Sequence, residues 1–268
     1  NTTEPEDIKP GRRDYTWTVD TLKPPEGRSV PYSMWGGNAS DVWAVGLSYL
    51  NAYCIWHFDG ISWTNYTPDE YIAPSCIWGT SSNNIWIGST DGSFWHYDGI
   101  KWNKFSETII PNYQQFIVQS MCGRSANEIY AVGFADSIGG NNYKAIIMRY
   151  NGARWEQVII PKIKSSFDQI LYDDVSNNFI ITGLIFNQND ESIYSFNGIS
   201  LDKIFFIFYS VSINKIAKNV YAVVKGKIYK HKHNNFEMCV DLSSTNYAGA
   251  AYGRSDKDFF TINWDGIG

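Results

Sequence analysis

Three stretches of the sequence decide the fold: WGGNASDVWAVG at residues 35–46, WGTSSNNIWIGS at 78–89 and CGRSANEIYAVG at 122–133. Each reads as a short apolar strand, a polar turn and a second strand in which apolar and aromatic residues alternate. Weaker copies begin at Tyr172, Ile213 and Tyr252, and the six starts are 43, 44, 50, 41 and 39 residues apart. That period is typical of four-stranded blades and is too long for leucine-rich or ankyrin repeats.

A second signature follows the first in each of four repeats: HFDGISW at 57–63, HYDGIKW at 96–102, RYNGARW at 149–155 and SFNGISL at 195–201. An Asp-Gly or Asn-Gly pair between apolar runs predicts a hairpin with a type I′ turn, in which both central residues have positive φ. This hairpin joins the third strand of each blade to the fourth. In the fifth repeat the Gly is missing, and we expect His233-Asn234-Asn235 to form the turn.

The two ends of the chain predict how the ring closes. Asp14 to Val19 reads as an outermost fourth strand with no first three strands before it, and the last repeat has two strands and then stops where a third should begin. Pairing both ends in one blade removes exposed sheet edges. We therefore predict an all-β, six-bladed β-propeller at residues 14–268, preceded by a flexible linker at 1–13. If the chain is truncated, seven blades are the alternative.

Two repeat positions have a structural interpretation. Aromatic side chains at one position of the second strand are expected to fill the wedge between blades, each burying about 150–250 Å². These residues are Trp43, Trp86, Tyr130, Tyr221 and Phe260. The polar residue before each second strand is expected to bond its own turn. His57 and His96 share a third-strand position, and we interpret them as holding the hairpin rather than a metal.

Composition excludes several classes of protein. The chain has 268 residues, of which 44% are hydrophobic and 16% aromatic, too many for a disordered chain. A net charge of −5 argues against non-specific nucleic-acid binding, which needs a basic surface. The longest apolar run, Ile204–Ile213, is about half of the length that spans a bilayer, and no signal-peptide pattern opens the sequence.

No metal or cofactor motif is present in the sequence. The four cysteines lack CxxC spacing, and we interpret them as buried apolar residues; they are Cys54, Cys76, Cys122 and Cys239. The sequence has no phosphate-binding glycine loop and no GxSxG motif. We therefore expect no cofactor and no metal.

The two repeated motifs resemble those of secreted or surface-anchored bacterial β-propeller proteins, in which a WGxSxxDVWAVG segment alternates with an HYDGxxW hairpin. The resemblance covers nearly the whole chain from Tyr15 onward. It implies an exported protein at the periplasm, cell surface or outside the cell. It also implies a lipid anchor upstream of Asn1, with residues 1–13 as the linker that follows it.

The connections that vary in length lie on one face of the predicted propeller, where ligand-binding residues are most often found. Their acids, amides and tyrosines suit a glycan or a loop of a partner protein. The candidates are Asp69, Glu70, Tyr71, Tyr113, Asp136, Asn141, Tyr143, Asn189 and Asp190. Solvated loops without a ligand are the alternative interpretation.

The predicted function is a non-catalytic exported scaffold that binds a protein or a glycan through this face. One alternative is a carbohydrate-active enzyme, which needs two carboxylates about 5–10 Å apart. The available pairs would combine Asp69 or Glu70 with Asp136 or Asp190. A second alternative is a structural subunit of a cell-envelope complex.

Overall fold

The computed structural model of the protein describes residues 22, 29–48, 53–66, 68–137, 143–185, 190–207, 211–243, 247–255, 258–263 and 266–267. Every regular secondary-structure element in these ranges is a β-strand. Among these residues there is no helix long and apolar enough to cross a membrane.

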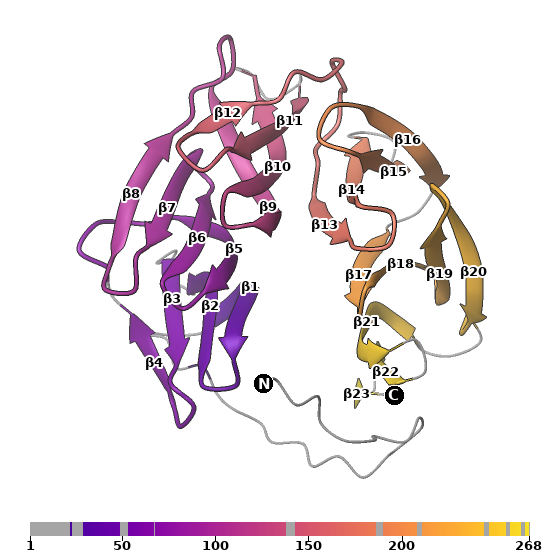
Figure 1. The fold of residues 1–268 in the computed structure, drawn as a ribbon, viewed down its shortest axis with the longest axis horizontal. Helices are drawn as coiled ribbons and strands as arrows, with labels where there is room; N and C mark the ends of the chain where they lie inside the picture. Colours follow the sequence, from indigo (N-terminus) through magenta and orange to yellow (C-terminus); the bar gives the residue numbers. More distant parts are fainter. Residues whose placement is uncertain are drawn as a thin grey trace.

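The strands form six antiparallel sheets, five of four strands and one of three, and in each sheet the strands follow one another in chain order. Figure 1 shows the sheets arranged around a ring, with β5 on the inner side of its blade and β8 on the outer side. The strands are β1 (Ser29–Asn38), β2 (Asp41–Ser48), β3 (Tyr53–Phe58), β4 (Trp63–Tyr66), β5 (Pro74–Ser81), β6 (Asn84–Ser89), β7 (Ser93–Tyr97), β8 (Trp102–Glu107), β9 (Gln115–Ser125), β10 (Glu128–Asp136), β11 (Tyr143–Tyr150), β12 (Trp155–Gln157), β13 (Gln169–Asp173), β14 (Asn178–Ile185), β15 (Asp190–Phe196), β16 (Leu201–Ile207), β17 (Ser212–Ile216), β18 (Asn219–Val224), β19 (Lys227–Lys232), β20 (Asn235–Asp241), β21 (Tyr247–Ser255), β22 (Asp258–Asn263) and β23 (Gly266–Ile267).

The predicted six-bladed β-propeller is therefore confirmed. Each copy of the twelve-residue repeat supplies the first two strands of one blade, and the strands pair directly, as Trp35 with Trp43 and Trp78 with Trp86. The polar turn between them places the second strand antiparallel to the first, so the alternating side chains face the two neighbouring blades.

The third-to-fourth-strand hairpins exist, but the predicted type I′ turn is wrong for the Asp-Gly and Asn-Gly repeats. Only the glycine has positive φ, as at Gly60 (94°) and Gly99 (95°). The loop has four residues, and the Asp or Asn side chain that precedes the glycine accepts hydrogen bonds from the backbone N–H groups two and three positions after it. Asp59 Oδ1 accepts from Ile61 N and Ser62 N, both at 2.9 Å, and Asp98, Asn151 and Asn197 repeat this pattern.

The fifth hairpin has the tight turn that the other four lack. β19 ends at Lys232 and β20 begins at Asn235, so the connection has two residues. His233 and Asn234 have φ of 47° and 62°, which is the backbone of a type I′ turn. The predicted turn is thus confirmed for these two residues, whereas Asn235 belongs to the following strand.

The aromatic residues of the second strands are wedged between blades, as predicted. Trp43, Trp86 and Tyr130 are each only 1% exposed. Each one contacts two rings of the next blade. The contacts, given as centroid distances, join Trp43 to Tyr97 (4.9 Å) and Trp102 (5.7 Å), Trp86 to Tyr150 (4.7 Å) and Trp155 (5.6 Å), and Tyr130 to Phe179 (4.7 Å) and Phe196 (5.3 Å). Tyr221 is buried too, while the side chain of Phe260 lies outside the described residues.

The innermost strands of successive blades are joined by side chains that bond the neighbouring backbone. Ser33 Oγ of β1 accepts from Ile77 N of β5 at 3.2 Å, and Ser75 Oγ of β5 donates to Val118 O of β9 at 2.5 Å. The series continues around the ring with Ser120 Oγ accepting from Ile170 N (3.2 Å) and Gln169 Oε1 accepting from Ile213 N (2.9 Å). Four of the blade junctions therefore carry one such bond near the axis.

Several predictions about the ends and loops are not tested or need correction. The linker at 1–13 and the closing strand at Asp14–Val19 lie outside the described residues. The last blade has a short third strand, β23, paired with β22, where none was expected. In blades three and four, three of the candidate residues expected on variable connections are strand residues, because Asp136 pairs with Tyr143 and Ile185 with Asp190.

We predict that Trp86→Ala lowers the free energy of unfolding by about 3–5 kcal/mol, because it leaves a cavity where the indole met Tyr150 and Trp155. The measurement is urea-induced unfolding followed by far-ultraviolet circular dichroism. Ile100→Ala is the control, since Ile100 is 82% exposed at a hairpin tip and should change stability by no more than about 0.5 kcal/mol. Equal effects of the two substitutions on the free energy of unfolding would contradict the stabilising role of Trp86 between the blades.

Candidate functional site

The conserved geometry of the first two blades uses its polar side chains internally. Asp41 Oδ1 accepts from Trp43 Nε1 at 3.0 Å and lies 2.8 Å from His57 Nε2. The imidazole of His57 stacks on the indole of Trp43 with ring centroids 4.2 Å apart. In blade two, Asn84 Oδ1 binds Trp86 Nε1 and His96 Nε2 in the same way, at 3.1 and 2.8 Å. Both histidines therefore bind the first residue of the second strand and lie against the second-strand tryptophan, rather than holding the third-to-fourth-strand hairpin as predicted.

Other blades replace the imidazole with a cation. Arg149 lies over the ring of Tyr130 at 6.0 Å, and Lys230 lies over the ring of Tyr221 at 5.7 Å. Each pair sits directly across two neighbouring strands, as His57 and Trp43 do. A basic or imidazole group over an aromatic face contributes about 0.5–1 kcal/mol at exposed sites, so these contacts are structural.

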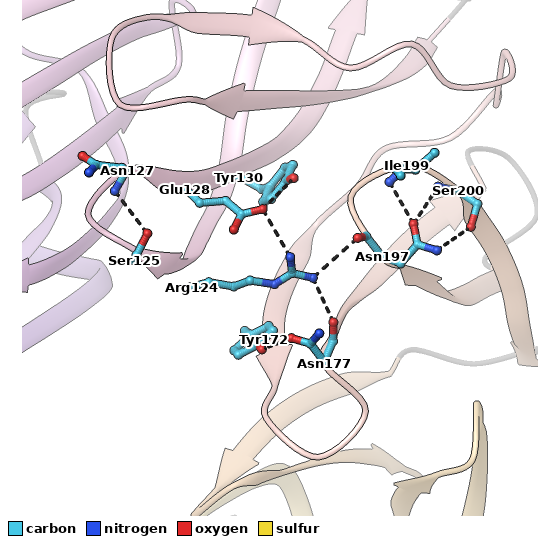
Figure 2. A network of polar contacts seen from close by, with 10 residues as sticks. All are labelled: Arg124, Ser125, Asn127, Glu128, Tyr130, Tyr172, Asn177, Asn197, Ile199 and Ser200. Carbon is cyan, nitrogen blue, oxygen red and sulfur yellow. Dashed lines mark hydrogen bonds and ion pairs between the residues drawn. The ribbon is translucent and has the colours of Figure 1, made fainter.

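Arg124 forms the most extensive polar network between two blades (Figure 2). Its Nη1 lies 3.2 Å from Glu128 Oε1, and its Nη2 donates to the backbone oxygens of Asn177 at 2.8 Å and Asn197 at 3.5 Å. The hydroxyl of Tyr130 donates to the same Glu128 oxygen at 3.2 Å. The guanidinium thus ties blade three to two turns of blade four.

The guanidinium of Arg124 also lies close to two aromatic rings of blade four. It is 5.4 Å from the centroid of Tyr172 and 5.1 Å from that of Phe179. Tyr172 in turn donates its hydroxyl to Asn177 Oδ1, which steadies the turn that Arg124 binds. Because its charge is satisfied by Glu128 and these turns, Arg124 serves as a clamp rather than as a site for an anion.

A buried carboxylate and imidazole join blade four to blade five. Asp173 Oδ2 lies 2.6 Å from His231 Nδ1, and the two side chains are 1% and 0% exposed. Burial alone would raise the pKa of Asp173, but hydrogen bonds from His231, Ser176 and the Val175 N–H outweigh it and hold the pKa below its usual value. The pair lines a hollow of about 430 Å³, into whose rim the exposed His233 extends.

Two of the cysteines, Cys76 and Cys122, have buried thiols that stay protonated near neutral pH. Burial raises the pKa of Cys76 to about 12 and that of Cys122 to about 11. Both are therefore buried apolar residues, as predicted, whereas Cys239 is exposed, contrary to that prediction. The side chain of Cys54 lies outside the described residues. No group of three or more His, Cys, Asp or Glu residues in the described ranges is placed to hold a metal ion.

The predicted site residues near the first blade lie on an exposed connection. Asp69, Glu70 and Tyr71 lie on the connection from β4 to β5, and all three are exposed, Tyr71 by 71%. None of them lines any of the three hollows described for this structure. The enzyme hypothesis that uses these acids remains a prediction.

The structure does bring together three of the predicted residues at the edge of blade three. Asp136 pairs with Tyr143 across β10 and β11, and its backbone oxygen accepts from Gln114 N at 2.8 Å. Tyr113 lies next to Gln114 and lines a hollow of about 260 Å³ at the junction of blades two and three. Asn141, Asn189 and the side chain of Asp190 lie outside the described residues.

The largest of the three hollows, about 790 Å³, lies near the axis of the ring. It crosses from the first blade to the fourth, fifth and sixth, because the first strand of each contributes to it. Three of its side chains are unusually exposed for their size: Tyr32 by 50%, Met34 by 65% and Tyr252 by 58%. The full lining is Leu22, Pro31, Tyr32, Ser33, Met34, Ala44, Trp63, Gln169, Leu171, Ile213, Asn214, Lys215 and Tyr252.

Few polar groups line this axial hollow. Gln169 Oε1 and Ser33 Oγ accept the hydrogen bonds that join neighbouring blades. Gln169 Nε2 has no partner among the described residues. Lys215 is the one charged residue of the lining, and its ammonium lies 2.7 Å from Asp174. A wide, mostly apolar cavity with a few placed polar groups is typical of ligand-binding sites.

Sequence reasoning missed the axial hollow. Tyr32 and Met34 precede the first repeat and lie on β1, whose pairing with β2 shifts register between Pro31 and Ser33. The available signal was an aromatic residue and a methionine at positions where the second and third repeats have Ser75, Ile77, Gln119 and Met121. Only the tertiary structure shows that such positions, far apart in the sequence, line one cavity.

Comparison with solved structures gives propellers at low sequence identity. YCF48 bound to D1 peptide matches with 16% identity and a TM-score of 0.58 over 95% of this chain and 81% of that chain. YCF48 from Cyanidioschyzon merolae matches with 13% identity and a TM-score of 0.58 over 90% of this chain and 81% of that chain. The fucose-recognising lectin of Aleuria aurantia, a six-bladed β-propeller, matches with 14% identity and a TM-score of 0.51 over 88% of each chain.

At these identities the likeness establishes the fold alone. No protein-family model matches the chain. No curated protein matches it either.

We predict that Asp173→Asn lowers the free energy of unfolding at pH 6 by about 1–3 kcal/mol, because it weakens a buried charged hydrogen bond. The folded pKa of Asp173 lies below the unfolded value of about 3.9, so its contribution is present above that pH and is lost as pH falls through the folded pKa. The deficit of the variant should therefore shrink toward pH 3 in urea titrations.

Asp174→Asn is the matched control for this titration. Asp174 is the next residue and pairs with Lys215, but its side chain is 40% exposed. Its loss should cost no more than about 1 kcal/mol. A deficit for Asp173→Asn that stays constant from pH 6 to pH 3 would contradict the assigned role of the carboxylate.

Proposed function

We propose that this protein is a non-catalytic binding module that holds an apolar segment of a partner protein in the axial hollow. One observation carries the proposal: Tyr32, Met34 and Tyr252 are each at least half exposed around a cavity of about 790 Å³. Large apolar side chains left exposed together mark interaction sites, and tyrosine and methionine are enriched at protein interfaces.

The size and chemistry of the hollow support a protein segment. Its volume falls within the range of about 300–1,000 Å³ that is typical of ligand pockets. Lys215 and the amides of Gln169 and Asn214 supply a few polar groups among apolar neighbours. YCF48, whose fold is similar, has been solved with a bound D1 peptide, so a propeller of this kind accommodates a peptide.

Export, a lipid anchor and membership in a larger complex are further parts of the proposal. Export and a lipid anchor upstream of Asn1 rest on the resemblance of the repeats to those of bacterial surface propellers. Membership in a cell-envelope complex is compatible with a peptide-binding module, since the bound segment would then belong to a neighbouring subunit.

The proposal predicts that peptides selected from a random twelve-residue library against this protein are rich in apolar residues and bind in the axial hollow. The double substitution Tyr32→Ala, Met34→Ala should weaken the binding of a selected peptide at least about tenfold, and Tyr252→Ala should have a similar effect. The measurement is isothermal titration calorimetry with synthetic peptides.

Ile61→Ala is the control, because Ile61 is 89% exposed at a hairpin tip and does not line the hollow. It should leave the affinity within about twofold. A library that enriches no peptide, or peptides whose affinity is indifferent to all three hollow substitutions, would overturn the proposed function.

A further inference from the structure

A second hollow, of about 260 Å³, lies between blades two and three, away from the axial hollow. It is built from the turn between β6 and β7, the end of β8 and the connection from β8 to β9. Its lining comprises Asp91, Glu107, Thr108, Ile109, Ile110, Tyr113, Gln114, Gln115 and Phe116. The volume is slightly below the range of about 300–1,000 Å³ for drug-sized ligands, which limits the ligand to a small molecule or a single ring.

The walls of this hollow are held by backbone contacts. Thr108 N donates to Gly92 O at 3.0 Å, and Tyr113 N donates to Ile110 O at 3.1 Å. Gln115 Nε2 donates to the backbone oxygen of Thr90 at 2.6 Å. The connection is thus fixed at both ends before any ligand binds, which reduces the entropy that binding would otherwise cost.

The polar atoms of the hollow are mainly acceptors. Asp91 Oδ1 accepts from Ser93 N at 3.0 Å, and Glu107 Oε2 lies 2.7 Å from the ammonium of Lys104. The second oxygen of each carboxylate has no partner among the described residues. The phenol of Tyr113 and the side-chain amide of Gln114 add groups that donate as well as accept.

Buried hydroxyl groups next to the hollow are also without partners. Ser89 and Ser93, at the two ends of the β6–β7 turn that carries Asp91, are 0% exposed and are not part of the lining, and neither Oγ has a hydrogen-bond partner among the described residues. Asp136 Oδ1, on the neighbouring strand end, is buried and unpartnered as well. Buried polar groups of this kind are usually satisfied by water or ligand, so this end of the two blades is a hydrogen-bonding environment.

The charges restrict the class of ligand. Two carboxylates against one nearby ammonium disfavour an anion, and two carboxylates fall short of the three-residue metal group that the described residues lack. Ile109, which is 81% exposed, offers an apolar surface at the rim. Hydroxyl donors around an apolar ring face would satisfy both features.

We propose that this hollow binds one ring of a neutral saccharide. Sugar hydroxyls donate to the carboxylates of Asp91 and Glu107, the amide of Gln114 and the phenol of Tyr113 complete the hydrogen bonds, and the C–H face of the ring lies against Ile109. The site is separate from the axial hollow, so it gives the propeller a second, independent binding function.

The test is a titration of the ¹⁵N-labelled full chain with methyl glycosides of neutral hexoses, deoxyhexoses and N-acetylhexosamines, at up to about 20 mM each. At least one glycoside should shift the side-chain amide resonances of Gln114 with a saturable dependence. Glu107→Gln and Gln114→Ala should each weaken that binding at least about tenfold, and for Gln114→Ala the titration is followed by the backbone amide resonances of Asp91, Thr108 and Tyr113.

Glu70→Gln is the matched control, since it neutralises an exposed carboxylate on the neighbouring connection that does not line the hollow. It should leave the affinity within about twofold. Three outcomes would overturn the proposal: no neutral glycoside binds, a hexuronate binds more tightly than the neutral sugars, or binding is abolished by EDTA, which would identify a cation site instead. Peptide binding at the axial hollow is measured separately, so either function can fail alone.

Discussion

The rest of this structure depends on one interaction, the packing of an aromatic side chain from each second strand against the next blade. A four-stranded twisted sheet has two faces to bury, and in this chain each face can be covered only by the neighbouring sheet. Trp43, Trp86 and Tyr130 provide that cover, and each meets two aromatic rings of the following blade. The ring of blades is therefore a chain of nearest-neighbour contacts.

The polar residues of the repeat hold the same aromatic side chain in place. The residue two positions before the aromatic accepts its N–H or O–H, and a histidine or cation from the third strand covers its face, as with Asp41, Trp43 and His57. Because these groups satisfy one another, the repeated residues have little capacity left for a ligand. Binding capacity instead belongs to residues that do not repeat, such as Tyr32, Met34 and Gln114.

The two hollows differ in chemistry because they occupy different parts of the ring. The axial hollow is enclosed by first strands, whose backbone groups are already paired, so its lining is largely apolar. The hollow between blades two and three is built from the β6–β7 turn, the end of β8 and the β8–β9 connection, which carry the polar side chains of Asp91, Glu107 and Gln114. Such a division gives one scaffold an apolar site and a polar site without overlap.

The sequence by itself determined the blades: the repeat period, the strand order within a blade and the wedge residues were predictable, because each depends on neighbours close in the chain. The bond from His57 to Asp41 was not, because it joins the third strand to the start of the second and not to its own hairpin. The turn geometry was not, since whether Asp59 takes positive φ or bonds two N–H groups depends on loop length, which a dipeptide does not encode. Only the tertiary structure decided the sites. Tyr32 and Tyr252 are 220 positions apart, and they line one hollow because the ring brings its first and last blades to the same axis.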